Sequence, residues 1–216
     1  MPRRMKKKTG HGKRHVVWHF QRRDPVLHGV LTRTEWEMLK PTEKPAGYFN
    51  RLCREIISQQ LGSGAARAIV ARFRLLFLRG RATPGRVLAL SEENLRGVGM
   101  SWAKARSLRD LAVRVEAREI DFQKFAAADD EQVIAELIKV KGIGRWTAEM
   151  FLIFTLGRED VFSFGDFALR KSLKSLYGPH RTRTQKNMER IVGRWSPYRS
   201  YACLALWHRM DNKKKK

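Results

Sequence analysis

The chain has 216 residues, of which 43% are hydrophobic and 31% charged, so it is long and apolar enough to bury a core. Its longest apolar stretch, residues 150–156, falls far short of the roughly 20 residues of a membrane helix. No apolar segment follows the basic first fifteen residues, which argues against a secretory signal. Composition therefore excludes the membrane and secreted classes of protein.

The charge balance indicates the class of partner. The 45 lysines and arginines outnumber the 21 acidic residues, and the net charge is +24. Such a surface attracts polyanions through its long-range field and through counterion release, which favours nucleic acid. A basic protein that is merely soluble, or one that binds an anionic membrane, is the alternative.

Both ends of the chain are strongly basic. Residues 1–14 are predicted to form a disordered basic arm, and residues 213–216, all lysines, a basic tail. Between them we expect one helical module, residues 15–212. The arm and tail are expected to add non-specific affinity for DNA, and the alternative is that they are exposed ends without effect.

Hydrophobic residues between these ends recur at helical spacing, and no longer run of alternating apolar and polar residues predicts a sheet. The spacing predicts helices over residues 48–61 and 65–78. The second helix is expected to bury four apolar residues, Ile69, Phe73, Leu76 and Phe77.

Capping residues mark three further helix starts. Ser101 is expected to cap one helix, and Asp129 with Gln132 resembles a capping box. Ser196 followed by Pro197 predicts the N-cap and first residue of a last helix, which runs to Met210. About ten helices this short must share packing faces, so the predicted fold class is all-α, with two lobes.

The two cysteines, Cys53 and Cys203, lie inside apolar helical patterns and are expected to be buried small hydrophobic residues. Two isolated thiols cannot form a four-cysteine zinc or iron–sulfur site. The histidines show no metal-ligand spacing with carboxylates. We therefore predict no transition metal and no other cofactor.

A glycine-rich turn separates two predicted helices, of which one ends near Ile138 and the next starts at about Arg145. Two glycines around one apolar residue permit positive φ and let a phosphate approach the backbone, and the amides of the following helix suit an anion. A plain tight turn is the alternative, but Lys139 and two further cations surround the loop. The predicted DNA-phosphate hairpin, within residues 137–157, consists of Val140, Lys141, Gly142, Ile143, Gly144 and Arg145.

The helix after this turn carries Trp146, Met150 and Phe154 on one face. Phe154 is expected to pack in the core, whereas Trp146, beside the turn, is at least as well suited to stack on a ligand. Asp166 follows Gly165 and precedes a periodic apolar run, a position that by spacing favours a helix N-cap. The residues alone thus indicate a cationic helical DNA-binding protein with a candidate carboxylate.

The sequence resembles the helix–hairpin–helix, Gly/Pro-rich loop, Asp superfamily of DNA base-excision glycosylases, and most closely the bacterial 3-methyladenine DNA glycosylase II family. The resemblance covers about residues 47–210. It rests on four blocks in the right order: LCREIISQQLGSGAA at 52–66, LRGVGMSWAKARSLRDLA at 95–112, KGIGRWTAEM with DVFSFGD within 141–166, and RWSPYRSYACLALW at 194–207.

The resemblance implies a role for each matching residue. Asp166 matches the catalytic aspartate. Trp146 and Trp207 match aromatic residues that line the base pocket, and Met150, on the same helix face as Trp146, is predicted to line that pocket too. Gln60 and Leu61 match the loop whose leucine fills the gap left by a flipped nucleotide, although composition alone favours a core leucine. The hairpin matches the phosphate-binding hairpin, which in the family often holds a monovalent cation on backbone carbonyls.

The implied chemistry suits these residue types. A base must be rotated out of the duplex before it can be attacked. Purines alkylated at N3 or N7 are cationic, so indole rings can bind them by cation–π contact. Cleavage of the glycosidic bond develops oxocarbenium character in the sugar, which an ionised carboxylate stabilises.

Two departures from the family pattern refine this interpretation. Members that also cut the DNA backbone carry a lysine where this chain has Trp146, so a monofunctional hydrolase that leaves an abasic site is expected. The proline that often precedes the aspartate is replaced by Ser163-Phe164-Gly165, which could alter the loop.

The expected partner is double-stranded DNA with damaged bases, bound by a monomer without a membrane, in a bacterial cytoplasm with the nucleoid or, in a eukaryote, in the nucleus. A glycosylase for deaminated or oxidised bases on the same fold is one alternative function. A non-catalytic helix–hairpin–helix DNA-binding protein is the other, since net charge and hairpin suit it equally well.

Overall fold

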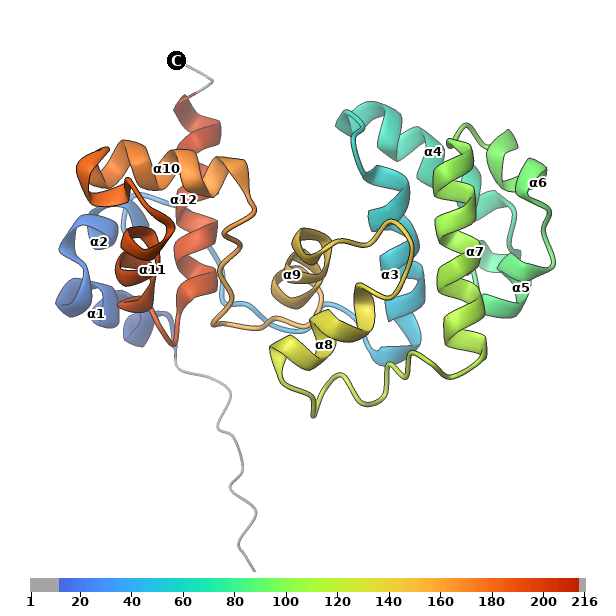
Figure 1. The fold of residues 1–216 in the computed structure, drawn as a ribbon, viewed down its shortest axis with the longest axis horizontal. Coiled ribbons are helices and arrows are strands. Elements are labelled where there is room, and N and C mark those ends of the chain that lie inside the picture. The colour runs from blue at the N-terminus through green and yellow to red at the C-terminus, as the bar shows by residue number, and fades with distance from the viewer. Residues whose placement is uncertain (1–11, 214–216) are drawn as a thin grey trace, which may run out of the picture. The chain divides into compact units, whose positions relative to one another are not determined.

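The computed structural model describes residues 12–213, with side chains up to Asp211 (Figure 1). This part of the chain folds into helices and contains no strand, as predicted. The helices are α1 (Lys13–Arg23), α2 (Pro25–Leu31), α3 (Pro45–Ser58), α4 (Ser63–Leu75), η1 (Leu78–Gly80), α5 (Pro84–Leu88), α6 (Glu92–Gly97), α7 (Trp102–Glu116), α8 (Asp130–Leu137), α9 (Arg145–Phe154), α10 (Phe167–Tyr177), η2 (His180–Thr182), α11 (Gln185–Gly193) and α12 (Arg199–Lys213).

Two compact units make up the fold. Unit 1 joins the N-terminal segment up to Leu39 with the C-terminal segment from Arg158, and therefore contains α1, α2 and α10 to α12. Unit 2 is the continuous segment Lys40–Gly157, which contains α3 to α9. The sequence prediction of an all-α fold with two lobes is confirmed.

Unit 1 is built around one hydrophobic core, to which α1, α2, α10, α11 and α12 each contribute fully buried side chains. A buried carboxylate ties this core together. Asp24 caps α2 through the amide of Leu27, and its other oxygen accepts hydrogen bonds from the Tyr177 hydroxyl at 2.8 Å and the Trp195 indole at 2.9 Å. Three donors thus compensate the burial of this carboxyl group.

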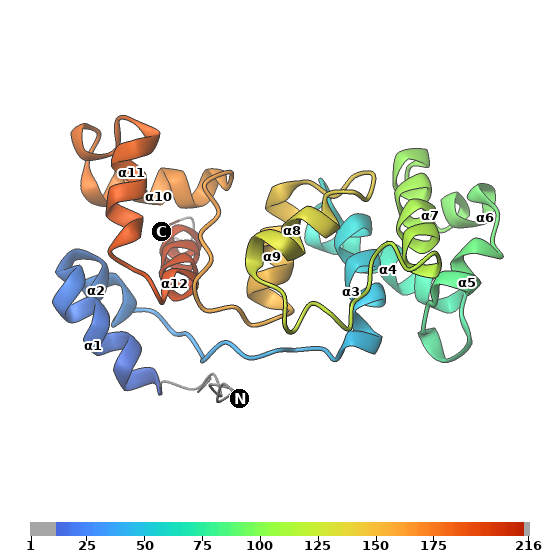
Figure 2. The same cartoon turned by 60° about the horizontal axis from the view of Figure 1, so that its bottom comes forward.

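Unit 2 packs α3 against α4 and α7, and α8 against α9 (Figure 2). Aromatic rings of α3, α9 and the segment before α8 form its densest cluster, with Tyr48, Phe122, Phe125 and Phe151 in edge-to-face or stacked contact. The predicted caps are present: Ser101 accepts the Lys104 amide, and Asp129 with Gln132 forms a complete capping box.

Both cysteines are buried, as expected from their apolar surroundings. Burial raises the pKa of the Cys53 thiol well above its ordinary value, which keeps that thiol protonated and inert.

Two sequence predictions about helix ends need correction. The last helix begins at Arg199, not beside Ser196 and Pro197, because the Ser196 hydroxyl donates to Asp160 instead of capping a helix. Leu76 is 37% exposed, because α4 ends at Leu75 and the chain then changes direction.

Residues 1–11 of the predicted arm, residues 1–14, lie outside the described residues. From Lys13 onward the predicted arm belongs to α1, so the prediction of disorder is wrong there. Residues 214–216 of the predicted tail also lie outside the described residues.

Candidate active site

The two glycines of the predicted hairpin have different tasks. Gly142 adopts φ +82°, and a Cβ added there would lie 2.6 Å from the Ser107 hydroxyl on α7, so this position requires glycine. Gly144, the N-cap of α9, has φ −92°, and no heavy atom would lie within 4 Å of an added Cβ. Only Gly142 therefore uses the predicted positive φ, while Gly144 leaves open space before the amides of α9.

Side chains from two other helices fix the hairpin. The Gln59 amide, just after α3, donates to the carbonyl of Gly142 at 2.9 Å and to the Thr147 hydroxyl at 3.3 Å. The carboxylate of Asp110, on α7, accepts a 2.8 Å bond from the backbone amide of Lys141. Sequence analysis missed both residues, because their partners lie 83 and 31 positions away and no local pattern marks them.

The turn that contains the candidate wedge is held from α7. Lys104 donates to the carbonyls of Ile57 at 2.9 Å and Gln59 at 2.7 Å, which satisfies acceptors at the end of α3. Burial lowers the pKa of Lys104. Gln60 then adopts φ +57°, and Leu61 is 36% exposed. The composition-based expectation of a core leucine is therefore wrong.

The cations around the hairpin are largely paired with acids. Arg145 bonds to Glu131 on α8 and, at 3.0 Å, to Glu149 on α9, and the hydrogen bond to Glu131 raises the pKa of Arg145. Lys139 pairs with Glu136 at 2.8 Å. Of the three cations expected here, Lys141 is the one whose side chain has no ionic partner among residues 12–211.

The predicted pocket residues of unit 2 lie on α9. Trp146, in its first turn, is 46% exposed, whereas Met150 is only 7% exposed. Phe154, expected in the core, is half-buried. The indole beside the hairpin thus reaches the protein surface, whereas Met150 is largely buried.

The remaining predicted residues, Asp166 and Trp207, lie in unit 1 and are brought together there. Asp166 caps α10: its Oδ1 atom accepts the Leu169 amide at 2.8 Å and the Trp207 indole N–H at 3.3 Å. The carboxylate residue is 8% exposed. Phe167, the first residue of this helix, is 77% exposed. The N-cap prediction is confirmed, and the same oxygen contacts an aromatic residue.

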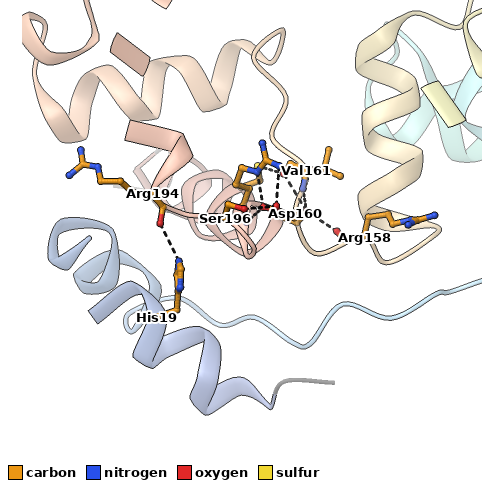
Figure 3. A network of polar contacts seen from close by, with 9 residues as sticks. His19, Arg158, Asp160, Val161, Arg194 and Ser196 are labelled. Atoms are coloured by element: carbon orange, nitrogen blue, oxygen red, sulfur yellow. Dashed lines mark hydrogen bonds and ion pairs between the residues drawn. The ribbon is translucent and has the colours of Figure 1, made fainter. Parts of the chain in front are cut away.

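The loop that leads to Asp166 is attached to the start of α12 by a polar network (Figure 3). Asp160 receives Arg199 Nε at 2.6 Å and the Ser196 hydroxyl at 2.7 Å. Burial alone would raise the pKa of Asp160, but these hydrogen bonds outweigh it and lower the pKa. Ser200 continues the network, since its hydroxyl donates to the Arg158 carbonyl at 2.7 Å.

The missing proline does not prevent the loop from turning. The amide of Asp166 donates to the carbonyl of Ser163 at 3.2 Å, and the Phe164 ring packs on Phe162 with centroids 4.7 Å apart. A turn and an aromatic contact hold the backbone that leads to the carboxylate.

Within the described side chains, no group of three or more His, Cys, Asp or Glu residues could hold a metal ion. In the hairpin, the carbonyls of Val140 and Gly142 accept bonds from the Ile143 amide and from Gln59. A monovalent cation on the hairpin carbonyls stays a prediction. No helix in residues 12–213 is long and apolar enough to cross a membrane.

The comparisons with known proteins agree on one protein family. Residues 53–197 match the model of the HhH-GPD superfamily base excision DNA repair protein. The chain is similar to DNA-3-methyladenine glycosylase 1 of Schizosaccharomyces pombe, with 34% identity over 161 residues, which are 74% of this chain and 71% of the relative.

Two solved structures are also similar. The DNA-3-methyladenine glycosidase of Bacillus halodurans has a TM-score of 0.81 and 33% identity, and the match covers 93% of this chain and 91% of the other. The S. pombe enzyme in complex with abasic DNA has a TM-score of 0.72 and 29% identity, and the match covers 89% and 95%. The chain therefore belongs to the HhH-GPD superfamily of base excision DNA repair proteins.

Proposed function

We propose that this protein is a monofunctional DNA glycosylase, which flips alkylated purines out of duplex DNA and hydrolyses their glycosidic bond. The observation that carries the proposal is the pairing of a buried carboxylate, Asp166, with the indole of Trp207. The relatives support it, because they are named 3-methyladenine glycosylases and one was solved with abasic DNA, the product of base removal.

Asp166 has the features that this chemistry needs. In a cationic methylated purine the electron pair of the broken C1′–N bond goes to the base, which leaves neutral, while C1′ becomes electron-poor. A carboxylate held by the Leu169 amide and the Trp207 N–H has one fixed orientation, and its negative charge stabilises the developing cation. Water then supplies its oxygen to C1′ and loses a proton, and an abasic site remains.

The candidate site residues of unit 2 are assigned to DNA recognition. The open space at Gly144, before the amides of α9, suits a backbone phosphate, with Lys141 as the cation beside it. Leu61, which is 36% exposed on its fixed turn, is the proposed wedge that fills the gap left by the flipped nucleotide, with Gln60 beside it. Trp146 and Met150 are assigned to the base pocket.

The proposed enzyme leaves the DNA backbone intact. Strand cleavage by related enzymes requires an amine that forms a Schiff base with the sugar. The chain carries Trp146 at the matching position after the hairpin, and the side chain of Lys139 is paired with Glu136. The protein is proposed to act as a monomer on duplex DNA, in the compartment that holds the chromosome.

The test incubates the purified protein with a duplex that contains one cationic methylated purine, and measures free base and strand breaks separately. We expect base release, with breaks that appear only after alkali treatment. Release of uracil, hypoxanthine or an oxidised base instead would show that the enzyme acts on a different class of damaged base. No release from any of these substrates, with duplex binding intact, would contradict the proposal and indicate a binding module.

A further inference from the structure

Helix α1 carries a basic surface that the proposed active site does not use. Its sequence, KRHVVWHFQRR, contains four lysines or arginines, two histidines and no acid. Val16 and Phe20 are fully buried in the core of unit 1, and His19 donates to the carbonyl of Arg194 at 3.2 Å. These contacts fix α1 on unit 1, with its basic residues directed outward.

The arginines of this surface are not neutralised by the protein. Arg14, Arg22 and Arg23 are exposed, and none of them has an acidic partner among residues 12–211. The acid next in sequence, Asp24, is 2% exposed and is occupied by Leu27, Tyr177 and Trp195 in the core. This surface differs from the hairpin, where acids already pair with Arg145 and Lys139.

An exposed tryptophan lies among these arginines. The Trp18 side chain is 56% exposed, and the Arg22 guanidinium lies over its ring, 4.8 Å from the centroid. Arg14, Trp18 and Arg22 follow one another at intervals of four residues, so they form one line of roughly 12 Å along the helix. That length spans three to four steps of a duplex, at about 3.4 Å for each phosphate of a strand.

A basic helix with an exposed tryptophan can also lie on an anionic membrane. Membrane-surface helices insert a continuous apolar face, however, and Val16 and Phe20 of α1 are buried in the protein core, with Val17 packed against it. A surface that offers guanidinium groups and one ring, without an insertable face, fits the sugar–phosphate backbone of nucleic acid.

We propose that Arg14, Trp18, Arg22 and Arg23 form a second DNA-binding surface, which holds the phosphate backbone of undamaged duplex independently of the damaged base. The identification of the polymer as DNA rests on the proposed function. The arginines bind phosphates, and the Trp18 ring keeps the Arg22 guanidinium in place and packs on the sugars. In the sequence, residues 1–11, which precede this helix, contain five further lysines and arginines.

The experiment measures binding of the full chain to a short undamaged duplex by fluorescence anisotropy over a range of salt concentrations. The variant R14Q/R22Q/R23Q removes the proposed contacts while glutamine preserves the helix. The control variant removes the same charge from exposed arginines of unit 2, as R79Q/R81Q/R118Q. Both variants have equal net charge, so the long-range field of the protein changes equally in the two.

For R14Q/R22Q/R23Q we expect the slope of log K against log salt to become shallower by roughly 2 to 3, since each phosphate contact contributes about 0.9. The control should keep the slope of the unmodified chain. Trp18→Ala should weaken binding at every salt concentration without a change of slope, since the indole is uncharged. Equal slopes for R14Q/R22Q/R23Q and the control would overturn the proposal.

A second measurement separates this proposal from the proposed function. Base release is followed in a single turnover at saturating protein, where DNA affinity no longer limits the rate. R14Q/R22Q/R23Q should release the base at the rate of the unmodified chain. A rate loss as large as that of an active-site variant would contradict the proposal that the α1 surface binds DNA independently of the active site. The binding slopes decide the proposal even if the unmodified chain releases no base.

Discussion

The two groups of candidate site residues are positioned in different ways. Asp166, in unit 1, is oriented by an amide three residues further along the chain and by one indole. The hairpin of unit 2 is oriented by Gln59 and Asp110, whose partners are far away in sequence. The proposed chemistry of the first group therefore depends on one oxygen atom of Asp166, whereas the proposed DNA recognition by the second group depends on contacts among three helices. Variants that affect either Asp166 or the hairpin, but not both, test this difference.

The largest effect is expected for Asp166→Asn. Asparagine caps a helix as well as aspartate does, and its amide oxygen can still accept the Leu169 amide. Only the negative charge is lost, so base release should fall by roughly 10² to 10³-fold or more while DNA binding survives. Single-turnover base release and duplex binding measure the two properties. Equal base release by Asp166→Asn and the unmodified chain would show that the carboxylate is only a cap.

The variant Asp166→Ala measures how much the helix cap contributes to stability. Alanine accepts no hydrogen bond from Leu169, so this variant should also lose about 1 kcal/mol of stability, which Asp166→Asn should not. Chemical denaturation of the two variants gives the difference. Similar stabilities of the two variants would mean that the Leu169 bond contributes little.

The two hairpin glycines form a matched pair for the second region. Gly142→Ala places a Cβ 2.6 Å from the Ser107 hydroxyl at φ +82°, so it should cost about 1 to 3 kcal/mol of stability. Gly144→Ala meets no atom within 4 Å and needs no positive φ, so stability should be unchanged. Its methyl group nevertheless occupies the space proposed for the phosphate, so DNA affinity should fall.

Thermal unfolding and duplex binding of both variants distinguish these outcomes. Full DNA affinity in a stable Gly144→Ala variant would show that no DNA phosphate occupies the space beside Gly144. A stable Gly142→Ala variant would mean that the turn relaxes at little cost.

A smaller loss is expected for Gln59→Ala, which removes the donor to the Gly142 carbonyl and to Thr147. Loss of these two bonds, of which the one to Thr147 is partly buried, should cost about 1 to 2 kcal/mol and speed hydrogen exchange of the hairpin amides. Gln60→Ala is the control, because the side chain of Gln60 makes no hydrogen bond within the described residues. Equal effects of the two variants would show that Gln59 does not hold the hairpin.

Local patterns predicted much of the fold and part of the local geometry of the candidate site. The capping boxes and caps at Ser101, Asp129 and Asp166 depend on residues three positions apart, and all three formed. The two-glycine turn was found for the same reason. A cap prediction failed at Ser196, where the hydroxyl has a distant partner, Asp160, that competes with the local one.

Long-range pairing explains what the sequence could not predict. The hydrophobic pattern placed Leu61 in the core, but the Lys104 bonds end α3 before that residue and leave it exposed. Cations near the hairpin were expected to face a phosphate, yet Arg145 binds Glu131 on the preceding helix. In both cases the outcome depends on a side chain from another helix or turn, which spacing along one helix does not reveal.

The smallest effect concerns His19, which lies at the edge of the polar network near Asp160 (Figure 3). Burial lowers the pKa of His19 below its ordinary value of 6.5, and nearby Arg23 lowers it further, although the Arg194 carbonyl and Asp160 act in the opposite direction. The unfolded chain then binds the proton more readily than the folded one, so this contribution to stability is complete above pH 6.5 and lost as the pH falls through the folded pKa.

His19→Gln removes the titrating group but keeps an amide N–H that can donate to the Arg194 carbonyl. Denaturant unfolding at about pH 7.5 and about pH 5 should therefore show a larger loss of stability on acidification for the unmodified chain than for the variant, because the other histidines titrate in both. Equal losses would mean that protonated His19 is accommodated in the fold. In that case the ring contacts with Phe20 and Tyr198, at 5.3 and 5.2 Å, would hold the imidazole in either charge state.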